Sequence, residues 1–202
     1  MDLLIGTGNP GKLREYRQLL DSIPFNILGL DDVGLGDVEI DESGETLEAN
    51  ATLKARAYAR ASGLLALADD TGLMVDALDG RPGIQAARYA GPGASDADRR
   101  RKLLREMAQV IEADRSARFE CVIALANPDD DSVITVTGVC RGQIVQQESR
   151  GGQQGFGYDA VFIPTGYDIT FAELGPEEKN RISHRGQAAQ QMQAILQQMT
   201  GE

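Results

Sequence analysis

The chain has 202 residues, 42% of them hydrophobic, which is enough to bury a core as one domain or one two-lobed unit. Its net charge of −11 argues against non-specific binding to nucleic acid or to anionic membranes. Its apolar stretches are too short to span a bilayer, and the N-terminus lacks the features of a signal peptide, so we expect a cytoplasmic enzyme.

A glycine-rich stretch at residues 5–12 is expected to connect a short strand at 3–5 to an amphipathic helix at 13–20. Its three glycines let the backbone turn sharply and approach a ligand closely. The helix start adds unpaired N–H groups and the positive end of the helix dipole, and Lys12 adds a full positive charge. Together these features predict an anion site, for which phosphate is the expected ligand.

The glycine spacing alone fits more than one class of site. Gly6, Gly8 and Gly11 form the GxGxxG fingerprint of dinucleotide-binding proteins, and Asp31 follows about twenty residues later, as that fingerprint requires. A nicotinamide-dependent oxidoreductase is therefore one candidate class. An ordinary glycine-rich turn between a strand and a helix is the structural alternative.

Two further interpretations give weight to other residues of the same turn. Its first and last glycines with Lys12 spell GxxxxGK, a P-loop, but Leu13 stands where a hydroxyl residue would hold magnesium. The last interpretation takes Thr7, Asn9 and Lys12 as the residues that bind the ligand, with the glycines as supporting geometry.

A second strand is expected at 25–30, followed by an acidic, glycine-spaced loop at 31–44 and a helix at 45–62. Asn50 and Lys54 lie four residues apart and therefore share one face of that helix. This face is either solvated or lines a cleft near the glycine-rich turn.

Two adjacent carboxylates, Asp69 and Asp70, interrupt an apolar region. We expect strands at 64–68 and 73–78, with a turn at 69–72 between them. Charged groups are costly to place beside apolar runs. The turn is therefore either simply solvated or holds a magnesium ligand or general base, since hard cations need anionic oxygens in rigid positions.

Ser95 is expected to cap a long helix at 96–114, on which the basic run 99–102 forms a solvated face. Cys121 and Cys140 fall in strand-like runs, and so sparse a pair predicts buried, reduced thiols. A single histidine excludes a metal site built from several histidines. A divalent cation would need carboxylate ligands, which favours magnesium or manganese.

Three consecutive strands are expected at 119–125, 132–140 and 143–147, with a hairpin turn at 127–131. Short connections make these strands largely antiparallel. A doubly wound dinucleotide-binding domain instead alternates helices with parallel strands. The antiparallel pattern therefore weakens the oxidoreductase interpretation.

The C-terminal half carries two further candidate binding segments. The loop at 151–159 contains two aromatic residues and a carboxylate, which either contact a nucleotide base or plug the core. Lys179, His184 and Arg185 form a cluster of hydrogen-bond donors before a final amphipathic helix. This cluster is either a solvated helix cap or part of a binding site.

Taken in order, six groups of residues resemble the inosine triphosphate pyrophosphatase family, which hydrolyses non-canonical purine nucleoside triphosphates. The matching segments are Thr7–Lys12, Glu42–Gly44 with Glu48–Asn50, Ala68–Gly72, Pro82–Gly83 with Ala87–Tyr89, Gly155–Asp159 and Ser183–Gly186. Departures are small: Thr71 stands where serine is usual, Gln153 and Gln154 replace small residues, and Ala160 replaces proline. None of them removes a charged or metal-binding group.

The resemblance implies an α/β fold over residues 1–202, a single domain in which an elongated mixed β-sheet is flanked by helices and two lobes surround a central cleft. It also implies a homodimer. The implied activity is magnesium-dependent cleavage of XTP, ITP and dITP to the nucleoside monophosphate and pyrophosphate, with manganese as an alternative ion. The implied role is to keep deaminated purines out of DNA and RNA.

The resemblance and the local chemistry together assign roles to the residues that act on the phosphates. The triphosphate would be held by Thr7, Gly8, Asn9, Pro10, Gly11 and Lys12, and Thr71 would also contact the substrate. Glu42 and Asp70 would hold magnesium, and Asp70 would orient or deprotonate the attacking water. Asp69 is either a second ligand or a support for its neighbour.

The base would be recognised by Phe156, Gly157, Tyr158, Asp159, Lys179, His184 and Arg185. Phe156 would pack on the purine, and Asp159 would accept from its ring N–H groups. Lys179, His184 and Arg185 would donate toward the 6-oxo group, which distinguishes hypoxanthine and xanthine from adenine. Besides the oxidoreductase, the rivals are a non-catalytic nucleotide sensor and a septum-inhibitor (Maf-type) pyrophosphatase acting on other nucleotides.

Overall fold

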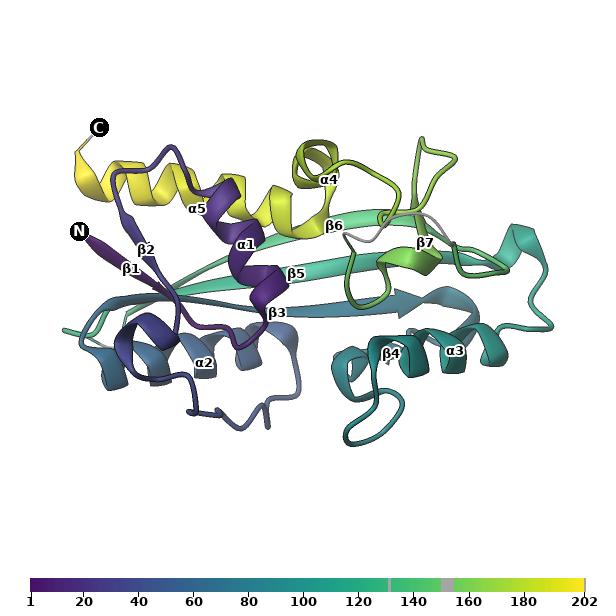
Figure 1. Ribbon diagram of the computed structural model, residues 1–202, viewed down its shortest axis with the longest axis horizontal. Coiled ribbons are helices and arrows are strands. Elements are labelled where there is room, and N and C mark those ends of the chain that lie inside the picture. Colours follow the sequence, from purple (N-terminus) through teal and green to yellow (C-terminus); the bar gives the residue numbers. More distant parts are fainter. Residues whose placement is uncertain (131, 150–154, 202) are drawn as a thin grey trace. The chain divides into compact units, whose positions relative to one another are not determined.

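The computed structural model describes residues 1–130, 132–149 and 155–201 (Figure 1). The strands are β1 (Asp2–Ile5), β2 (Asn26–Leu28), β3 (Leu65–Val75), β4 (Pro82–Gly83), β5 (Ser116–Ala126), β6 (Val133–Ile144) and β7 (Phe162–Pro164). The α-helices are α1 (Pro10–Leu19), α2 (Leu47–Ser62), α3 (Asp96–Glu106), α4 (Pro176–Ile182) and α5 (His184–Thr200). Single-turn 3₁₀ helices are η1 (Asp31–Val33), η2 (Asp76–Leu78), η3 (Ala86–Arg88), η4 (Glu112–Asp114) and η5 (Asp159–Val161).

The strands form one sheet in the order β2-β1-β3-β5-β6-β7, with β4 paired to β3 outside this path. The residues group into two compact units. Unit 1 comprises Met1–Asp70, Cys121–Gly138 and Arg185–Glu202, and unit 2 comprises Thr71–Glu120 and Val139–His184. Strands β3, β5 and β6 therefore contribute residues to both units.

In unit 1, β1 pairs in parallel with both β2 and β3. Helices α1 and α5 lie on one side of these strands and α2 lies on the other (Figure 1). Leu3 and Ile5 of β1 pack with Tyr16 of α1 and Met192 of α5 in one buried cluster. Because strand side chains alternate between faces, the equally buried Leu4 points away from that cluster.

The bounds of α2 follow from its capping residues. Thr46 Oγ1 accepts a hydrogen bond from Ala49 N at 3.0 Å. Gly63 has a φ of 70°, the left-handed conformation in which glycine ends helices. The helix predicted at 45–62 is confirmed, with its first residue at Leu47.

In unit 2, β4 pairs antiparallel with the end of β3, and β7 pairs antiparallel with the end of β6. The core of this unit is aromatic. Phe119 lies 4.7 Å from Phe162 and 6.0 Å from Phe171 between ring centroids, and His184 stacks on Phe119 at 4.6 Å. Together with the parallel pairs of unit 1, these pairings confirm the expected mixed sheet with flanking helices.

Strand β3 corrects the prediction for residues 69–72. The strand runs through them without a break, so the turn expected between two shorter strands is wrong. Asp69 and Asp70 are buried within it, with 2% and 7% of their surfaces exposed. Carboxylates are tolerated in such a place only where other side chains bind them. Lys12 and Asn50 are among the side chains that do so.

Helix α3 is shorter than predicted. Ser95 caps it as expected, but the helix ends at Glu106. Arg115 donates to the carbonyl oxygens of Met107 at 2.9 Å and Val110 at 3.2 Å. Its guanidinium therefore binds two carbonyl oxygens just past the helix end. In a longer helix these oxygens would accept backbone N–H groups of the next turn.

The basic run of α3 is not the solvated face that we predicted. Arg99, Arg100 and Lys102 each donate to a backbone carbonyl of unit 2, at distances of 2.7–2.8 Å. Of the four residues in the run, Arg101 alone projects into solvent, with 73% of its side chain exposed. Three of the four charges thus hold neighbouring segments in place.

The last part of the predicted meander is also corrected. Residues 143–144 complete β6, and 145–147 are not a strand, so the separate strand predicted at 143–147 is wrong. The next strand is β7, which pairs Ile163 with Gln143 of β6. Two predictions fall partly outside the described residues, at Asp131 of the hairpin turn and at 151–154 of the following loop.

The state of the two cysteines and the apolar character of the helices were both predicted from composition. Cys121 and Cys140 are buried and are not joined in a disulfide bond, which confirms the predicted reduced thiols. Across residues 1–130, 132–149 and 155–201, no helix has both the length and the apolar character needed to cross a membrane.

The pairing of β6 with β7 predicts a strict requirement for glycine at position 142. A Cβ there would overlap the Ile163 carbonyl oxygen and lie 2.6 Å from Phe162 Cζ, so Gly142→Ala should lower the free energy of unfolding by about 1–3 kcal/mol. Gly8→Ala is the control for stability, because its Cβ would meet no atom within 4 Å. Urea denaturation measures both, and equal stability of the two variants would contradict the packing described here.

Candidate active site

The turn between β1 and α1 is organised by Asn9. Its Oδ1 accepts hydrogen bonds from Gly11 N at 2.8 Å and Lys12 N at 3.2 Å, which makes Asn9 the N-cap of α1. Pro10 has no N–H, and Asn9 N donates to Thr7 Oγ1 at 3.2 Å. The expectation of unpaired N–H groups is wrong, because Asn9 caps them. A phosphate that used them would have to displace its side chain.

The glycines of this turn do not adopt the left-handed conformation that a sharp turn would need. Gly6, Gly8 and Gly11 all lie outside the positive-φ region. A Cβ at Gly6 would overlap the ring of Tyr58 from α2. Close approach of α2 therefore explains the glycine at position 6.

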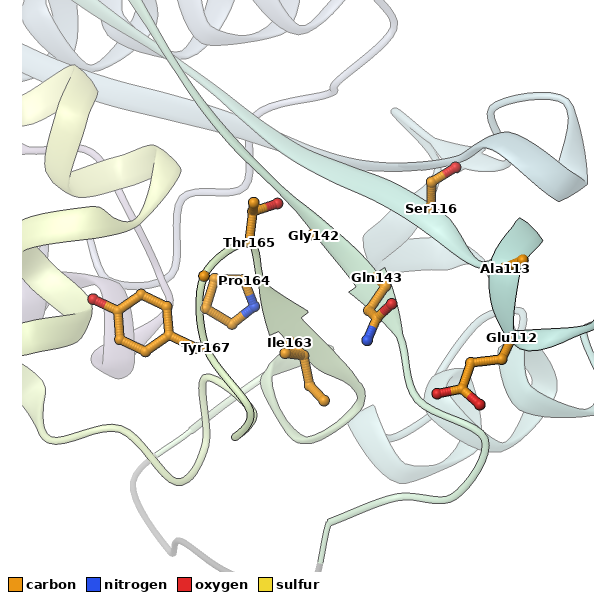
Figure 2. A pocket seen from close by; sticks show the side chains of 10 residues that line it. Glu112, Ala113, Ser116, Gly142, Gln143, Ile163, Pro164, Thr165 and Tyr167 are labelled. Atoms are coloured by element: carbon orange, nitrogen blue, oxygen red, sulfur yellow. The ribbon is translucent and has the colours of Figure 1, made fainter.

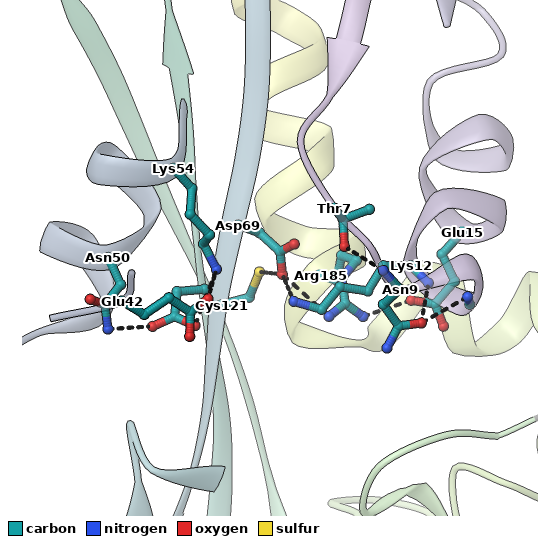
Figure 3. A network of polar contacts seen from close by, with 12 residues as sticks. Thr7, Asn9, Lys12, Glu15, Glu42, Asn50, Lys54, Asp69, Cys121 and Arg185 are labelled. Atoms are coloured by element: carbon teal, nitrogen blue, oxygen red, sulfur yellow. Dashed lines mark hydrogen bonds and ion pairs between the residues drawn. The ribbon is translucent and has the colours of Figure 1, made fainter. Parts of the chain in front are cut away.

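Asp69 is the centre of a buried charge network on one side of β3 (Figure 3). Its Oδ2 accepts from Lys12 Nζ at 2.8 Å and from Arg185 Nη2 at 3.4 Å, and Cys121 Sγ lies 3.7 Å from the same oxygen. Arg185 Nη1 donates in turn to Glu15 Oε2 at 2.6 Å. We call these five residues the Asp69 network. It joins β3 to α1 and to the first turn of α5.

The charges of the Asp69 network stabilise one another. Burial alone would raise the pKa of Asp69, but Lys12 and Arg185 outweigh it and hold that pKa well below its usual range. Burial would lower the pKa of Arg185, yet Glu15 and Asp69 hold it well above its usual value. Asp69 and Arg185 are therefore a charged pair at neutral pH.

Asp70, the next residue of β3, has different partners. Asn50 Nδ2 donates to its Oδ2 at 3.1 Å, and Lys54 Nζ lies 3.6 Å from its Oδ1 and 2.5 Å from Glu42 Oε1. Consecutive residues of a strand point to opposite faces. Figure 3 accordingly shows Asn50, Lys54 and Glu42 on the side of β3 opposite Lys12, Glu15 and Arg185.

Asn50 and Lys54 do not form a solvated face, which corrects one of the two interpretations of this pair. Asn50 is 1% exposed, and its Oδ1 accepts from Gly44 N at 2.8 Å. Burial would lower the pKa of Lys54, but nearby carboxylates, Asp69 and Asp70 above all, raise it. Burial raises the pKa of Asp70 in spite of Lys54.

Glu42 and Asp70, the two predicted magnesium ligands, share one cation in the structure, the Lys54 ammonium. Magnesium is commonly held by one or two carboxylates together with substrate phosphates. Two carboxylates that converge on one positive charge fit that pattern. Among the described residues, no group of three or more His, Cys, Asp or Glu side chains is arranged to hold a metal.

In unit 2, three of the residues predicted to recognise the base lie together. Lys179 Nζ donates to Asp159 Oδ2 at 2.8 Å and lies 4.8 Å from the centroid of the Phe156 ring. The same Asp159 oxygen accepts from Phe156 N at 2.9 Å. Lys179 and Asp159 are only 6% and 5% exposed, so this ion pair is shielded from water.

The other residues predicted at the base have structural contacts of their own. Tyr158 is 4% exposed and its hydroxyl donates to Ala86 O at 2.9 Å, so its side chain belongs to the core. His184 stacks on Phe119, and Arg185 belongs to the Asp69 network of unit 1. Direct donation from His184 and Arg185 to a base stays a prediction.

The predicted residues thus form two groups, one in each unit. Thr71 is half-buried on β3 as the first residue of unit 2. A pocket of about 250 Å³ in unit 1 is lined in part by Thr7, Gly8 and Pro10. A pocket of about 580 Å³ in unit 2, bordered by β6, β7 and the following loop, contains none of the predicted residues (Figure 2).

The chain is similar to known proteins over nearly its whole length. The model of the Ham1 family matches residues 3–195. A dITP/XTP pyrophosphatase of Oceanobacillus iheyensis is 43% identical and covers 96% of this chain and 97% of its own; one from Geobacter sulfurreducens is 46% identical, with 92% of each chain covered. The solved structure of a HAM1 protein from Coxiella burnetii has a TM-score of 0.86 at 40% identity, covering 98% of this chain and 99% of its own. These findings confirm the resemblance identified from the motifs.

Glu15 is the member of this site that the sequence motifs did not single out. It lies three residues after Lys12, and that spacing places both side chains on one face of α1. The spacing was therefore a usable signal. Its partner Arg185 is about 170 residues away in the chain and could not be found from local sequence.

The Asp69 network predicts that Glu15→Ala is strongly destabilising. The variant leaves the Arg185 guanidinium, 3% exposed, without its shorter ion pair, so the free energy of unfolding should fall by about 3–5 kcal/mol. Arg17→Ala on the same helix is the control, since Arg17 and Asp32 are about half exposed and their pair should contribute about 0–1 kcal/mol. Similar losses in the two variants would show that Glu15 does not anchor Arg185.

Proposed function

Because the chain belongs to the Ham1 family, we propose that it hydrolyses the non-canonical purine nucleoside triphosphates XTP, ITP and dITP to the nucleoside monophosphate and pyrophosphate. The observation that carries this proposal is its nearly full-length similarity to proteins named dITP/XTP pyrophosphatase. The chain is then a hydrolase that acts on an acid anhydride. Its biological role is to keep deaminated purines out of DNA and RNA.

The triphosphate is bound at the start of α1. Asn9 fixes the shape of this turn, and Thr7 Oγ1 and the Lys12 ammonium supply a hydroxyl and a positive charge beside it. Asp69 holds the ammonium in one position, so little side-chain entropy is lost when a phosphate arrives. The N–H groups of Gly11 and Lys12 become available when the Asn9 side chain turns away.

Asp70 orients or deprotonates the attacking water. Burial raises its pKa, which makes it a stronger base than an exposed aspartate. Asn50 and Lys54 contact its two oxygens and limit its rotation. Magnesium bound by Glu42 and Asp70 would supply positive charge against the phosphates during the reaction.

The base is recognised by the group in unit 2. Phe156 packs on the purine, and Lys179 and Asp159 offer a donor and an acceptor held in a fixed, water-shielded pair. A buried donor that meets the 6-amino group of adenine instead of a 6-oxo group is left without a partner. Each such mismatch costs about 1–3 kcal/mol, which favours hypoxanthine and xanthine.

We further propose that the protein acts as a homodimer in the cytoplasm, with magnesium as its cofactor and manganese as an alternative ion. The homodimer follows from the family resemblance alone. The acidic net charge of −11 argues against nucleic acid or an anionic membrane as a partner, so an anionic triphosphate must be bound at a locally positive site.

The proposed substrates and products can be tested directly. With magnesium present, ITP and XTP should be consumed much faster than ATP, and chromatography should show the monophosphate and pyrophosphate. Chelation of the metal should stop turnover, and manganese should restore part of it. Release of orthophosphate with the diphosphate would contradict the proposed bond cleavage.

The catalytic role of Asp70 can be tested with an isosteric substitution. Asp70→Asn keeps the shape of the side chain but removes the base, so kcat for ITP should fall by about 10²–10⁴-fold while circular dichroism stays that of the parent protein. Asp21→Asn, at an exposed position of unit 1, should leave kcat unchanged. Near-normal turnover by Asp70→Asn would remove this residue from the mechanism.

A further inference from the structure

Gly157, in the loop that carries Phe156, is bound by α3 at both of its backbone polar groups. Asp96 Oδ2 accepts from Gly157 N at 2.7 Å, and Arg100 Nη1 donates to Gly157 O at 2.7 Å. Asp96 and Arg100 lie four residues apart, so they project from one face of the helix. Two side chains of one helical turn thus hold a single loop residue.

Both clamping side chains are themselves held in place. Arg99 Nη1 donates to Asp96 Oδ1 at 2.8 Å, which leaves the other carboxylate oxygen for Gly157. Arg100 Nε donates to Glu148 Oε1 at 2.7 Å, and 16% of the Arg100 side chain is exposed. A side chain fixed at a second point loses little entropy when it binds the loop.

The clamp acts on a residue whose conformation decides where its neighbour points. Gly157 has a φ of 60°, in the left-handed region, and a Cβ there would meet no atom within 4 Å. Gly157 has no side chain that could pack and hold this backbone, so the hydrogen bonds with Asp96 and Arg100 restrain it. They act beside the bond from Phe156 N to Asp159 Oδ2, which restrains the preceding residue. Phe156 precedes it directly, so a change in the Gly157 backbone would shift the residue that carries the ring beside Lys179.

We propose that Asp96 and Arg100 are positioning residues that set base specificity by fixing the backbone of Gly157 and thereby the orientation of Phe156. This inference rests on the proposed function, in which Phe156 packs on the purine. Neither side chain needs to touch the nucleotide. Arg100, which belongs to the basic run 99–102, then supports base recognition through Gly157.

The consequence for kinetics is specific. Asp70 belongs to unit 1 and is held by Asn50 and Lys54, so loss of the clamp leaves its surroundings intact. A loosened Phe156 lets the purine shift relative to Lys179 and Asp159, the groups that distinguish a 6-oxo from a 6-amino base. KM for ITP should therefore rise and the preference for ITP over ATP should fall, with a smaller change in kcat. Small misplacements of a positioning group cost up to about 10²-fold, so the ratio of kcat/KM for ITP to that for ATP should fall by about 10- to 100-fold.

The experiment measures this ratio for the parent protein and for Asp96→Ala, Arg100→Ala, Asp96→Asn and Arg101→Ala. Asp96→Asn keeps an oxygen acceptor for Gly157 N and should restore most of the preference that Asp96→Ala loses. Arg101→Ala is the matched control on the same helix, because the Arg101 side chain is 73% exposed and should change nothing. Melting temperatures recorded in parallel show whether a variant is folded.

The results distinguish a failure of the proposed function from a failure of the inference about Asp96 and Arg100. A parent protein that does not hydrolyse ITP overturns the proposed function and this inference with it. A parent that prefers ITP, with alanine variants that keep the same preference, overturns the inference alone. A uniform loss with ITP and ATP alike, accompanied by a lower melting temperature, also overturns it, since that result shows a purely structural role. Selective loss with rescue by Asp96→Asn supports it.

Discussion

The burial of two consecutive carboxylates in one strand is the constraint on which the candidate site depends. Asp69 and Asp70 point to opposite faces of β3, and a buried carboxylate needs cationic or hydrogen-bonding partners. Each face must therefore supply its own. Lys12 and Arg185 serve Asp69, whereas Asn50 leads the group around Asp70. The N-terminal turn, α2 and the start of α5 are all fixed to β3 by meeting this requirement.

The pKa values of the two aspartates are shifted in opposite directions, down for Asp69 and up for Asp70, which suits them to different roles. Lys12 and Arg185 keep Asp69 ionised, and their bonds to it hold α1 and α5 to the strand. Burial raises the pKa of Asp70, which leaves that carboxylate reactive toward a proton. In unit 2 the same principle applies to Phe156, whose loop is fixed by side chains that do not need to touch the base.

Much of the fold class could be predicted, and the residues proposed for the site could be named, because they lie in short ordered motifs with capped helices between them. Residues 69–72 were misjudged because their composition is typical of a turn, and the partners that keep them in a strand come from distant parts of the chain. The solvated face predicted for 99–102 was wrong because Arg99, Arg100 and Lys102 bind backbone carbonyl groups, which leave no signal in the residue types of the sequence. Asp31 and Gly8 line the same pocket. The chain also has a parallel β1–α1–β2 unit like that of dinucleotide-binding proteins, and this shared unit explains the spacing of its glycines and Asp31.

The central claim is that Asp69 is a structural anion and Asp70 a reactive one. Comparing the free energy of unfolding of Asp69→Asn and Asp70→Asn with that of the parent protein tests it most directly. Asp69→Asn leaves Lys12 and Arg185 without their shared anion and should lose about 3–5 kcal/mol. Asp70→Asn should lose less than about 1 kcal/mol or gain stability, because burial already disfavours its charge. Equal losses, or a larger loss for Asp70→Asn, would contradict this division.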